Sequence, residues 1–155
     1  MTKDYFLWMD KQILDVCNFS IEDVVGIPLD EYIQLSMNKI VPKNEIRSVY
    51  RLLIEGDQAV AMGGLRKLPN GHGEIVRLYT KPSSRGKGFG RAMLEKIIDE
   101  ARDFHFPVLN LDTGIFMRDA QSLYISNGFQ FCDPYDGAEP PPRLLPYWLY
   151  MKLKL

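Results

Sequence analysis

A glycine-rich basic loop between a strand and a helix is the feature that most restricts what this chain can fold into. Residues 77–94 read RLYTKPSSRGKGFGRAML: a strand-like segment, three glycines among basic residues, and then an apolar helical segment. A turn needs only one or two glycines. Gly86, Gly88 and Gly90 together therefore indicate a backbone that closely approaches something else, within a strand–loop–helix unit of an α/β fold.

The start of the helix after this loop is a predicted anion site. The first N–H groups of a helix have no intrahelical partner, and the helix dipole places about half a positive charge there. Arg85, Lys87 and Arg91 add formal charge, and the glycines have no Cβ atoms that would keep an anion from the amides. A phosphate-bearing ligand is therefore expected. The alternative is a tight turn with flexible glycines and solvated basic residues.

Two common phosphate motifs do not fit this loop. A P-loop requires GxxxxGK followed by Ser or Thr, but Gly88 follows Lys87 and the earlier glycine is missing. A dinucleotide fingerprint requires GxGxxG, and Arg91 stands where the third glycine would be. The loop therefore needs another explanation.

Composition and charge exclude several function classes. The chain has 155 residues, 46% of them hydrophobic, so it is expected to form one domain over residues 1–155. Its net charge of −1 gives no overall electrostatic field that would attract nucleic acid or an acidic membrane. Cys17 and Cys132 are far apart and both histidines are isolated, so no metal site is expected. The N-terminal segment MTKDYFLWMDKQ carries charges unlike a signal peptide, and no run is long enough to span a membrane. A cytoplasmic protein is the expectation.

Periodicity predicts a mixed α/β fold with a single sheet covered by helices. Helices are expected over residues 5–17, 28–37, 89–102 and 117–127, and strands over residues 48–55, 58–65, 74–80, 107–112, 129–132 and 147–155. The segment from Asp133 to Pro146 is predicted to be a proline-rich loop.

Two segments resemble the GNAT superfamily of N-acyltransferases. Arg85-Gly-Lys-Gly-Phe-Gly90 matches its acyl-CoA signature, [Gln/Arg]-x-x-Gly-x-[Gly/Ala], and Ala120-Gln-Ser-Leu-Tyr-Ile-Ser-Asn-Gly-Phe129 is similar to its A-x-x-L-Y-x-x-x-G-F segment. The resemblance covers about residues 48–155 and extends to small prokaryotic members, most of them without assigned substrates. It implies a central, mostly antiparallel twisted sheet with one splayed parallel strand pair, flanked by helices.

The resemblance also implies acetyl-CoA as the co-substrate and assigns residues to it. Main-chain groups of Leu78, Tyr79 and Thr80 would contact the pantetheine arm and the thioester carbonyl, where fixed N–H donors stabilise a developing oxyanion. The pyrophosphate would be held by the loop and the first helical turn: Arg85, Gly86, Lys87, Gly88, Phe89, Gly90 and Arg91. A solvated charge at the helix start is the alternative for Arg91.

Two side chains are candidates for the proton transfers that accompany attack of an amine on the thioester. The amine must lose a proton at neutral pH, and the leaving thiolate gains one. Tyr124 stands where superfamily members commonly place the tyrosine that protonates the CoA sulfur, although a core aromatic would have the same spacing. Glu74 lies eleven positions before Arg85, which is the spacing of the general base in histone-type members. Two alternatives remain: a water relay could accept the proton, or Glu74 could be a strand-end residue that is solvated or paired with Arg77. Strand parity predicts that Arg77 points to the opposite face of the sheet from Glu74.

The acceptor side is less defined by the sequence. Its candidate contacts are Asp112, Tyr135, Tyr147 and Trp148, with core packing as the alternative for Trp148. Met117 stands where many superfamily members carry Asn, so one polar contact with the coenzyme is in doubt. The chain also begins with a helical pattern in place of the superfamily's first strand, so an unusual substrate-side wall is expected.

These observations predict an acetyl-CoA-dependent N-acetyltransferase that acts on a primary amine of a small molecule. A protein or peptide amine as the acceptor is one alternative. A sensor domain that binds acyl-CoA without catalysis is another. Dimers are common in the superfamily, and a homodimer is the assembly that this resemblance implies.

Overall fold

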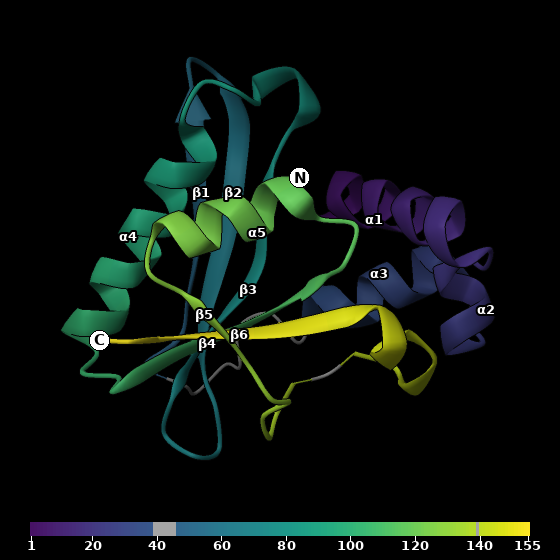
Figure 1. Cartoon of the computed structure of the whole chain (residues 1–155). Helices are drawn as coiled ribbons and strands as arrows, with labels where there is room; N and C mark the ends of the chain where they lie inside the picture. The colour runs from purple at the N-terminus through teal and green to yellow at the C-terminus, as the bar shows by residue number, and fades with distance from the viewer. Residues whose placement is uncertain (39–45, 139) are drawn as a thin grey trace.

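The computed structural model describes residues 1–38, 46–138 and 140–155. Its sheet has six strands in the order β1-β2-β3-β4-β6-β5. The strands are β1 Val49–Glu55, β2 Gln58–Lys67, β3 Gly73–Thr80, β4 Val108–Gly114, β5 Gln130–Cys132 and β6 Trp148–Lys154. Within this described part of the chain β3 and β4 form the one parallel pair, and the other neighbours are antiparallel (Figure 1). This arrangement confirms the predicted fold class.

The helices agree with the predicted pattern and add short elements to it. They are α1 Thr2–Cys17, α2 Ile21–Val25, α3 Leu29–Asn38, α4 Phe89–Asp103 and α5 Arg118–Ser126, with 3₁₀ turns η1 Pro82–Ser84 and η2 Pro142–Tyr147. The segment predicted as a proline-rich loop therefore contains η2 except for its last residue, Tyr147. The sequence analysis did not predict α2, which begins with a capping box: Ser20 Oγ accepts from the Asp23 N–H, and the Asp23 carboxylate accepts from the Ser20 N–H.

One hydrophobic cluster joins the sheet to α4 and α5. The buried stripe of α4 includes Met93, Ile97 and Ala101, whose helical spacing turns them toward the sheet. Ala61 and Leu111 from β2 and β4 belong to the same cluster. This packing sets the start of α4 against the end of β3.

A second hydrophobic cluster holds the N-terminal helices together. Phe6, Ile13 and Ile33 from α1 and α3 are buried there with Leu144 from η2. Figure 1 shows α1, α2 and α3 on the opposite side of the molecule from α4. No helix in the described ranges combines the length and apolar character that crossing a bilayer requires.

The parallel strands β3 and β4 diverge soon after they begin. Their pairing covers Gly73 with Leu109 and Glu74 with Asn110 among the described residues. Beyond these pairs the two strands separate, so the edge of β3 that faces β4 has no strand partner there. The predicted splay of this pair is confirmed.

A bulge in β3 overturns the strand-parity prediction for Arg77. Arg77 has a left-handed φ of 54°, and the register between β2 and β3 shifts where Arg77 and the next residue lie. Its guanidinium therefore lies over the Phe6 ring and donates to the Ser36 carbonyl. These residues belong to α1 and α3, so Arg77 lies on the same face as Glu74 and not on the opposite one.

Candidate functional site

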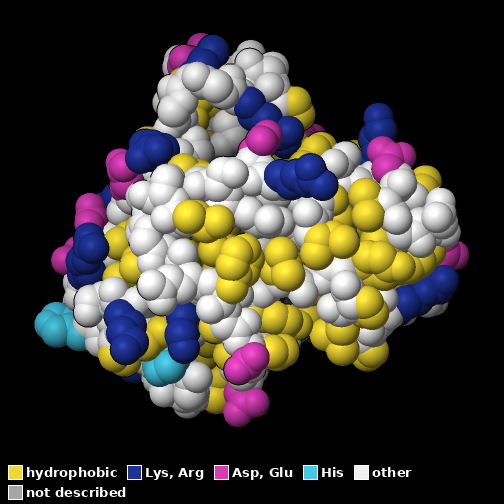
Figure 2. All heavy atoms as spheres, viewed as in Figure 1, with side chains coloured by type: hydrophobic (Ala, Val, Ile, Leu, Met, Phe, Trp, Pro, Cys, Tyr) yellow, Lys and Arg dark blue, Asp and Glu magenta, His cyan; other side chains and the backbone are white. Residues whose placement is uncertain are grey.

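A cleft of about 1030 Å³ opens at the splay between β3 and β4. Residues from the ends of these strands, the starts of α4 and α5, the N-terminal helices and η2 line it. Hydrophobic side chains form a band from the α5 region toward the N-terminal helices on the face shown in Figure 2. Nine of the ten predicted coenzyme residues line this cleft: Leu78, Tyr79, Thr80, Arg85, Gly86, Gly88, Phe89, Gly90 and Arg91.

The glycine loop leaves open space in front of the first turn of α4. Gly86 and Gly88 have left-handed φ values of 76° and 84°, and a Cβ at either position would meet no atom within 4 Å. Gly88 is the N-cap of α4 and supplies no side-chain cap. The helical hydrogen bonds begin with the Ala92 N–H, which donates to the Gly88 carbonyl. The earlier N–H groups of the helix are therefore the donors that an anion in this space would meet.

Gly90 has a different reason to be glycine. A Cβ there would lie 3.2 Å from the Thr80 Oγ1, which is tighter than an ordinary contact. Gly90 thus lets α4 approach the end of β3 closely, where the sequence analysis expected open space for an anion.

The three basic residues of the loop region lie in different surroundings. Arg85 lies over the Trp8 ring, 5.0 Å from its centroid, and its Nε donates to the Thr80 carbonyl at 3.3 Å. Arg91 is exposed and lines the cleft. Lys87 lies outside the lining, with its Nζ 3.4 Å from the Glu55 carboxylate.

Tyr124 lies both in the core and at the cleft, so its position is compatible with either interpretation that the sequence left open. Its side chain is 5% exposed and packs against Phe129, with ring centroids 5.9 Å apart, yet it also lines the cleft. Burial, and then the negative charge of Asp112, raise the pKa of the Tyr124 phenol well above its usual value of 10.0. The phenol therefore keeps its proton at neutral pH.

Glu74 lines the cleft with both carboxylate oxygens engaged. Arg66 Nε donates to Oε2, and the Tyr135 hydroxyl donates to Oε1 at 2.7 Å. The side chain of Glu74 is 1% exposed, and this burial raises its pKa, although Arg66 and Tyr135 act in the opposite direction. Its ionic partner is Arg66, and the pairing with Arg77 that the sequence suggested is wrong.

The other acceptor-side candidates divide between the cleft and the core. Asp112 and Trp148 both line the cleft, and the Trp148 indole N–H donates to the Asp112 Oδ1 at 2.6 Å. Tyr147 instead packs against Phe19 in the second cluster, with ring centroids 6.0 Å apart. Met117 also lines the cleft, so an apolar side chain lies at the position where the sequence analysis put one polar contact in doubt.

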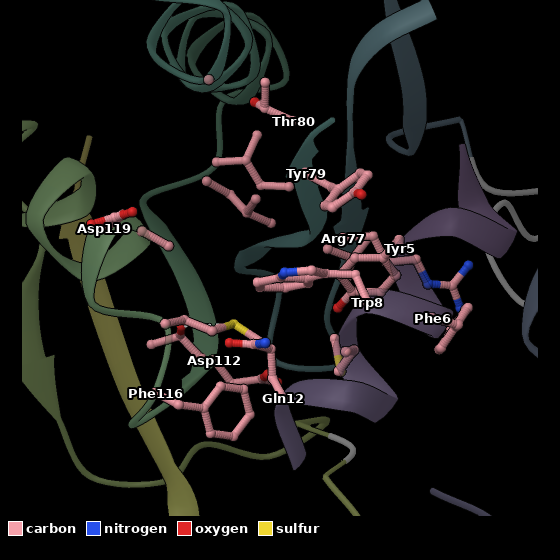
Figure 3. Close-up of a pocket in the computed structure, with 18 of the residues that line it drawn as sticks. Tyr5, Phe6, Trp8, Gln12, Arg77, Tyr79, Thr80, Asp112, Phe116 and Asp119 are labelled. Atoms are coloured by element: carbon pink, nitrogen blue, oxygen red, sulfur yellow. Dashed lines mark hydrogen bonds between the residues drawn. The ribbon is translucent and has the colours of Figure 1, made fainter. Parts of the chain in front are cut away.

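The sequence analysis missed the cleft residues of α1. Tyr5, Trp8 and Gln12 all line the cleft, and Figure 3 shows their side chains reaching into it from this helix. The rings of Tyr5 and Trp8 also contact the Tyr79 ring, with centroids 5.7 and 5.8 Å away. Helical spacing predicted the helix, but the same spacing describes residues that face a core and residues that face a cavity.

Comparisons with known proteins agree with this geometry. The family model described as Acetyltransferase (GNAT) family matches residues 21–129. The uncharacterized N-acetyltransferase YsnE of Bacillus subtilis (strain 168) is 39% identical over 90 residues, which are 56% of this chain and 60% of that protein. This chain therefore matches about three-fifths of the length of that relative.

Solved structures show the same fold at lower identity. A GNAT-family acetyltransferase from Staphylococcus aureus Mu50 has a TM-score of 0.71 and 17% identity, with 99% of this chain and 92% of that one covered. A Bacillus subtilis acetyltransferase in complex with CoA has a TM-score of 0.58 and 21% identity, with 82% of each chain covered. At these identities the similarity concerns the arrangement of helices and strands.

Proposed function

Because the chain belongs to the acetyltransferase (GNAT) family, we propose that it transfers an acetyl group from acetyl-CoA to a primary amine of a small molecule. One observation carries the proposal: the open glycine loop at the start of α4 and the protonated phenol of Tyr124 face the same cleft. The first suits a diphosphate, and the second suits a leaving thiolate. The CoA bound to the similar acetyltransferase from Bacillus subtilis supports this choice of donor.

The residues along the cleft fit the parts of the coenzyme. The N–H groups after Gly88, with Arg85 and Arg91, would hold the diphosphate. The unpaired edge of β3 over residues 78–80 would offer main-chain groups to the pantetheine arm and thioester. Lys87 would contact the diphosphate only if its ion pair with Glu55 breaks. The free-energy cost of breaking this pair is small because both side chains are about half exposed.

The reaction we propose is direct attack of the amine nitrogen on the thioester carbonyl carbon. The C–N bond forms, the C–S bond breaks, the nitrogen loses one proton and the sulfur gains one. Tyr124 would donate the proton to the sulfur. Glu74 would accept the amine proton, and because its oxygens already accept from Arg66 and Tyr135, we propose that the proton arrives by a relay.

The wall of the acceptor side favours a small molecule over a protein substrate. Residues of α1, α2, α3 and η2 all line the cleft, so helices cover the side where a peptide would have to enter. A homodimer and a cytoplasmic location remain predictions from the sequence, as does a single domain over residues 1–155.

Thiol release with acetyl-CoA and a panel of small amines and peptides tests this function. We expect release with at least one small amine and none with peptide amines. Calorimetry with acetyl-CoA alone gives a separate measurement of binding. Binding without release across the panel would support the sensor alternative, and no binding would refute both.

A further inference from the structure

We propose that Tyr135 is a positioning residue for Glu74: its hydroxyl fixes the carboxylate in place at the cleft and stabilises the ionised form that accepts the amine proton. This inference rests on the proposed function, in which Glu74 is the final acceptor of that proton. The sequence analysis considered Tyr135 as a contact for the acceptor amine. In the structure Tyr135 lies outside the cleft lining, whereas Glu74 belongs to it, so Tyr135 would act on the reaction through Glu74.

The segment that carries Tyr135 is anchored at the part of the sheet where Glu74 lies. The Tyr135 hydroxyl donates to Glu74 Oε1 at 2.7 Å. Arg66, whose Nε donates to the other carboxylate oxygen, also donates through Nη2 to the Gly137 carbonyl at 2.9 Å. The Tyr135 ring packs edge to face on Tyr150 of β6, with ring centroids 5.8 Å apart. Since Arg66 and Tyr150 hold this segment, the Tyr135 hydroxyl meets the carboxylate at a defined place.

Burial makes this hydrogen bond important for Glu74. The Glu74 side chain is 1% exposed, so water has little access to replace a donor that is lost. A buried carboxylate without its donors is strongly disfavoured, and a hydrogen bond to a charged group is roughly twice as strong as one between neutral groups. Each carboxylate oxygen accepts one bond, from Arg66 or from Tyr135, and keeps a second lone pair on which the relayed proton can bind. The two donors therefore orient Glu74 without blocking the proton transfer.

The groups around Glu74 act in opposite directions on its proton affinity. Burial raises the pKa of Glu74 and the charge of Asp112 adds to this effect, whereas Arg66 and the Tyr135 hydrogen bond oppose it. Burial, and then the charge of Glu74, raise the pKa of the Tyr135 phenol well above its usual value, so the hydroxyl remains a donor at neutral pH. Without Tyr135 the pKa of Glu74 would rise further, and a smaller fraction of Glu74 would be ionised and able to accept a proton.

The described charged and titratable groups on the neighbouring elements are Arg66 on β2, Asp112 on β4, Arg77 further along β3, Tyr150 behind Tyr135, and His72, which contacts Asn110. Of these, Arg66 and Asp112 act on the Glu74 carboxyl group, together with Tyr135. Removal of the Tyr135 hydroxyl should therefore have a definite sign: the ionised form of Glu74 loses a donor and becomes less stable.

The pH dependence of turnover tests this role with a matched pair of variants. Tyr135→Phe keeps the ring and removes the donor to Glu74, while the control Tyr150→Phe removes the hydroxyl of the ring packed against it. The assay uses the amine of the panel that releases thiol fastest, and the same amine in every variant.

On the acid limb of the pH profile, kcat/KM follows the ionised fraction of the proton acceptor. There Tyr135→Phe should lower kcat/KM about 10-fold, with a smaller change on the plateau at higher pH, so the acid limb moves to higher pH. Tyr150→Phe should keep the wild-type profile. An equal loss at every pH in Tyr135→Phe would indicate a packing role alone and would overturn the inference.

Carbon-13 NMR of the glutamate carboxyl groups gives a readout that does not depend on turnover. The Glu74 signal is the one missing from Glu74→Gln, and it should titrate at higher pH in Tyr135→Phe than in the wild type or in Tyr150→Phe. An unchanged titration would overturn the inference whether or not the protein acetylates amines, and so would a shifted titration with an unchanged acid limb. If the titration shifts but no amine is acetylated, the action of Tyr135 on Glu74 is supported and the proposed function alone fails.

Discussion

Substitution of Gly88 by tryptophan offers a direct test of the anion site at the start of α4. Gly88 and Gly71 both have a φ of 84°, and a Cβ at either position would meet nothing within 4 Å. Backbone strain of about 1–2 kcal/mol should therefore affect Gly88→Trp and the control Gly71→Trp alike. The melting temperature should fall by a similar amount, roughly 2–8 °C, in each variant.

The two variants should differ in coenzyme affinity. Gly88 is the N-cap of α4 in the cleft, whereas Gly71 lies in the turn between β2 and β3, outside the cleft lining. A tryptophan at position 88 would cover the helix-start amides, and each lost hydrogen bond to a charged group costs about 1.5–3 kcal/mol. Loss of two such bonds should raise the Kd for CoA at least about 100-fold.

Calorimetric titration with CoA, together with thermal unfolding, measures both effects. We expect weak or undetectable binding by Gly88→Trp and near-normal binding by Gly71→Trp. Unchanged affinity in a folded Gly88→Trp, or equal losses in the two variants, would refute the assignment of the diphosphate to these amides.

Three further predictions concern the proton donor, the buried carboxylate and the core. Tyr124→Phe should lower kcat roughly 100-fold in a thiol-release assay with little change in the Kd for CoA, and an unchanged kcat would leave Tyr124 with a packing role. Burial raises the pKa of Glu74 in the folded protein above its ordinary 4.5, so the unfolded chain loses this proton at a lower pH than the folded protein does. The free energy of unfolding of the wild type, relative to that of Glu74→Gln, should therefore fall as pH rises from about 4.5 through the raised pKa. Denaturant unfolding at several pH values measures this difference, and a constant difference would contradict the burial argument. Ile97→Ala removes a side chain that is 0% exposed and should cost about 2–5 kcal/mol in unfolding free energy, against less than about 0.5 kcal/mol for Ile54→Ala at 55% exposure. Similar losses in these two variants would contradict the assigned core.

Local sequence patterns were sufficient where neighbours in the chain decide the structure. Short-range signals of this kind are the apolar stripe of α4, the glycines before it and the turn at Gly56 between β1 and β2. The structure confirms the helix and strands that these signals predicted. The short helix α2 was missed because its five residues are too few to show periodicity. Its capping box at Ser20 and Asp23 was the signal that could have revealed it.

Strand parity failed at Arg77 because the rule assumes a regular strand. Arg77 has a left-handed backbone conformation that interrupts β3, and the alternation of side chains between the two faces shifts by one residue after it. No residue type nearby indicates such a bulge. This change turned a residue expected on the far face toward α1 and α3.

The sequence alone determined the mixed α/β fold class and the segments that could form a site, because periodicity and glycine positions are properties of neighbouring residues. The splayed strand pair was implied by the resemblance of two motifs to the GNAT superfamily. Only the tertiary structure decided the contacts across the cleft: Arg85 on Trp8, Glu74 with Arg66 and Tyr135, and Asp112 with Trp148. These partners lie on different elements, and they meet only because the N-terminal helices and the strands after α4 pack around one opening in the sheet.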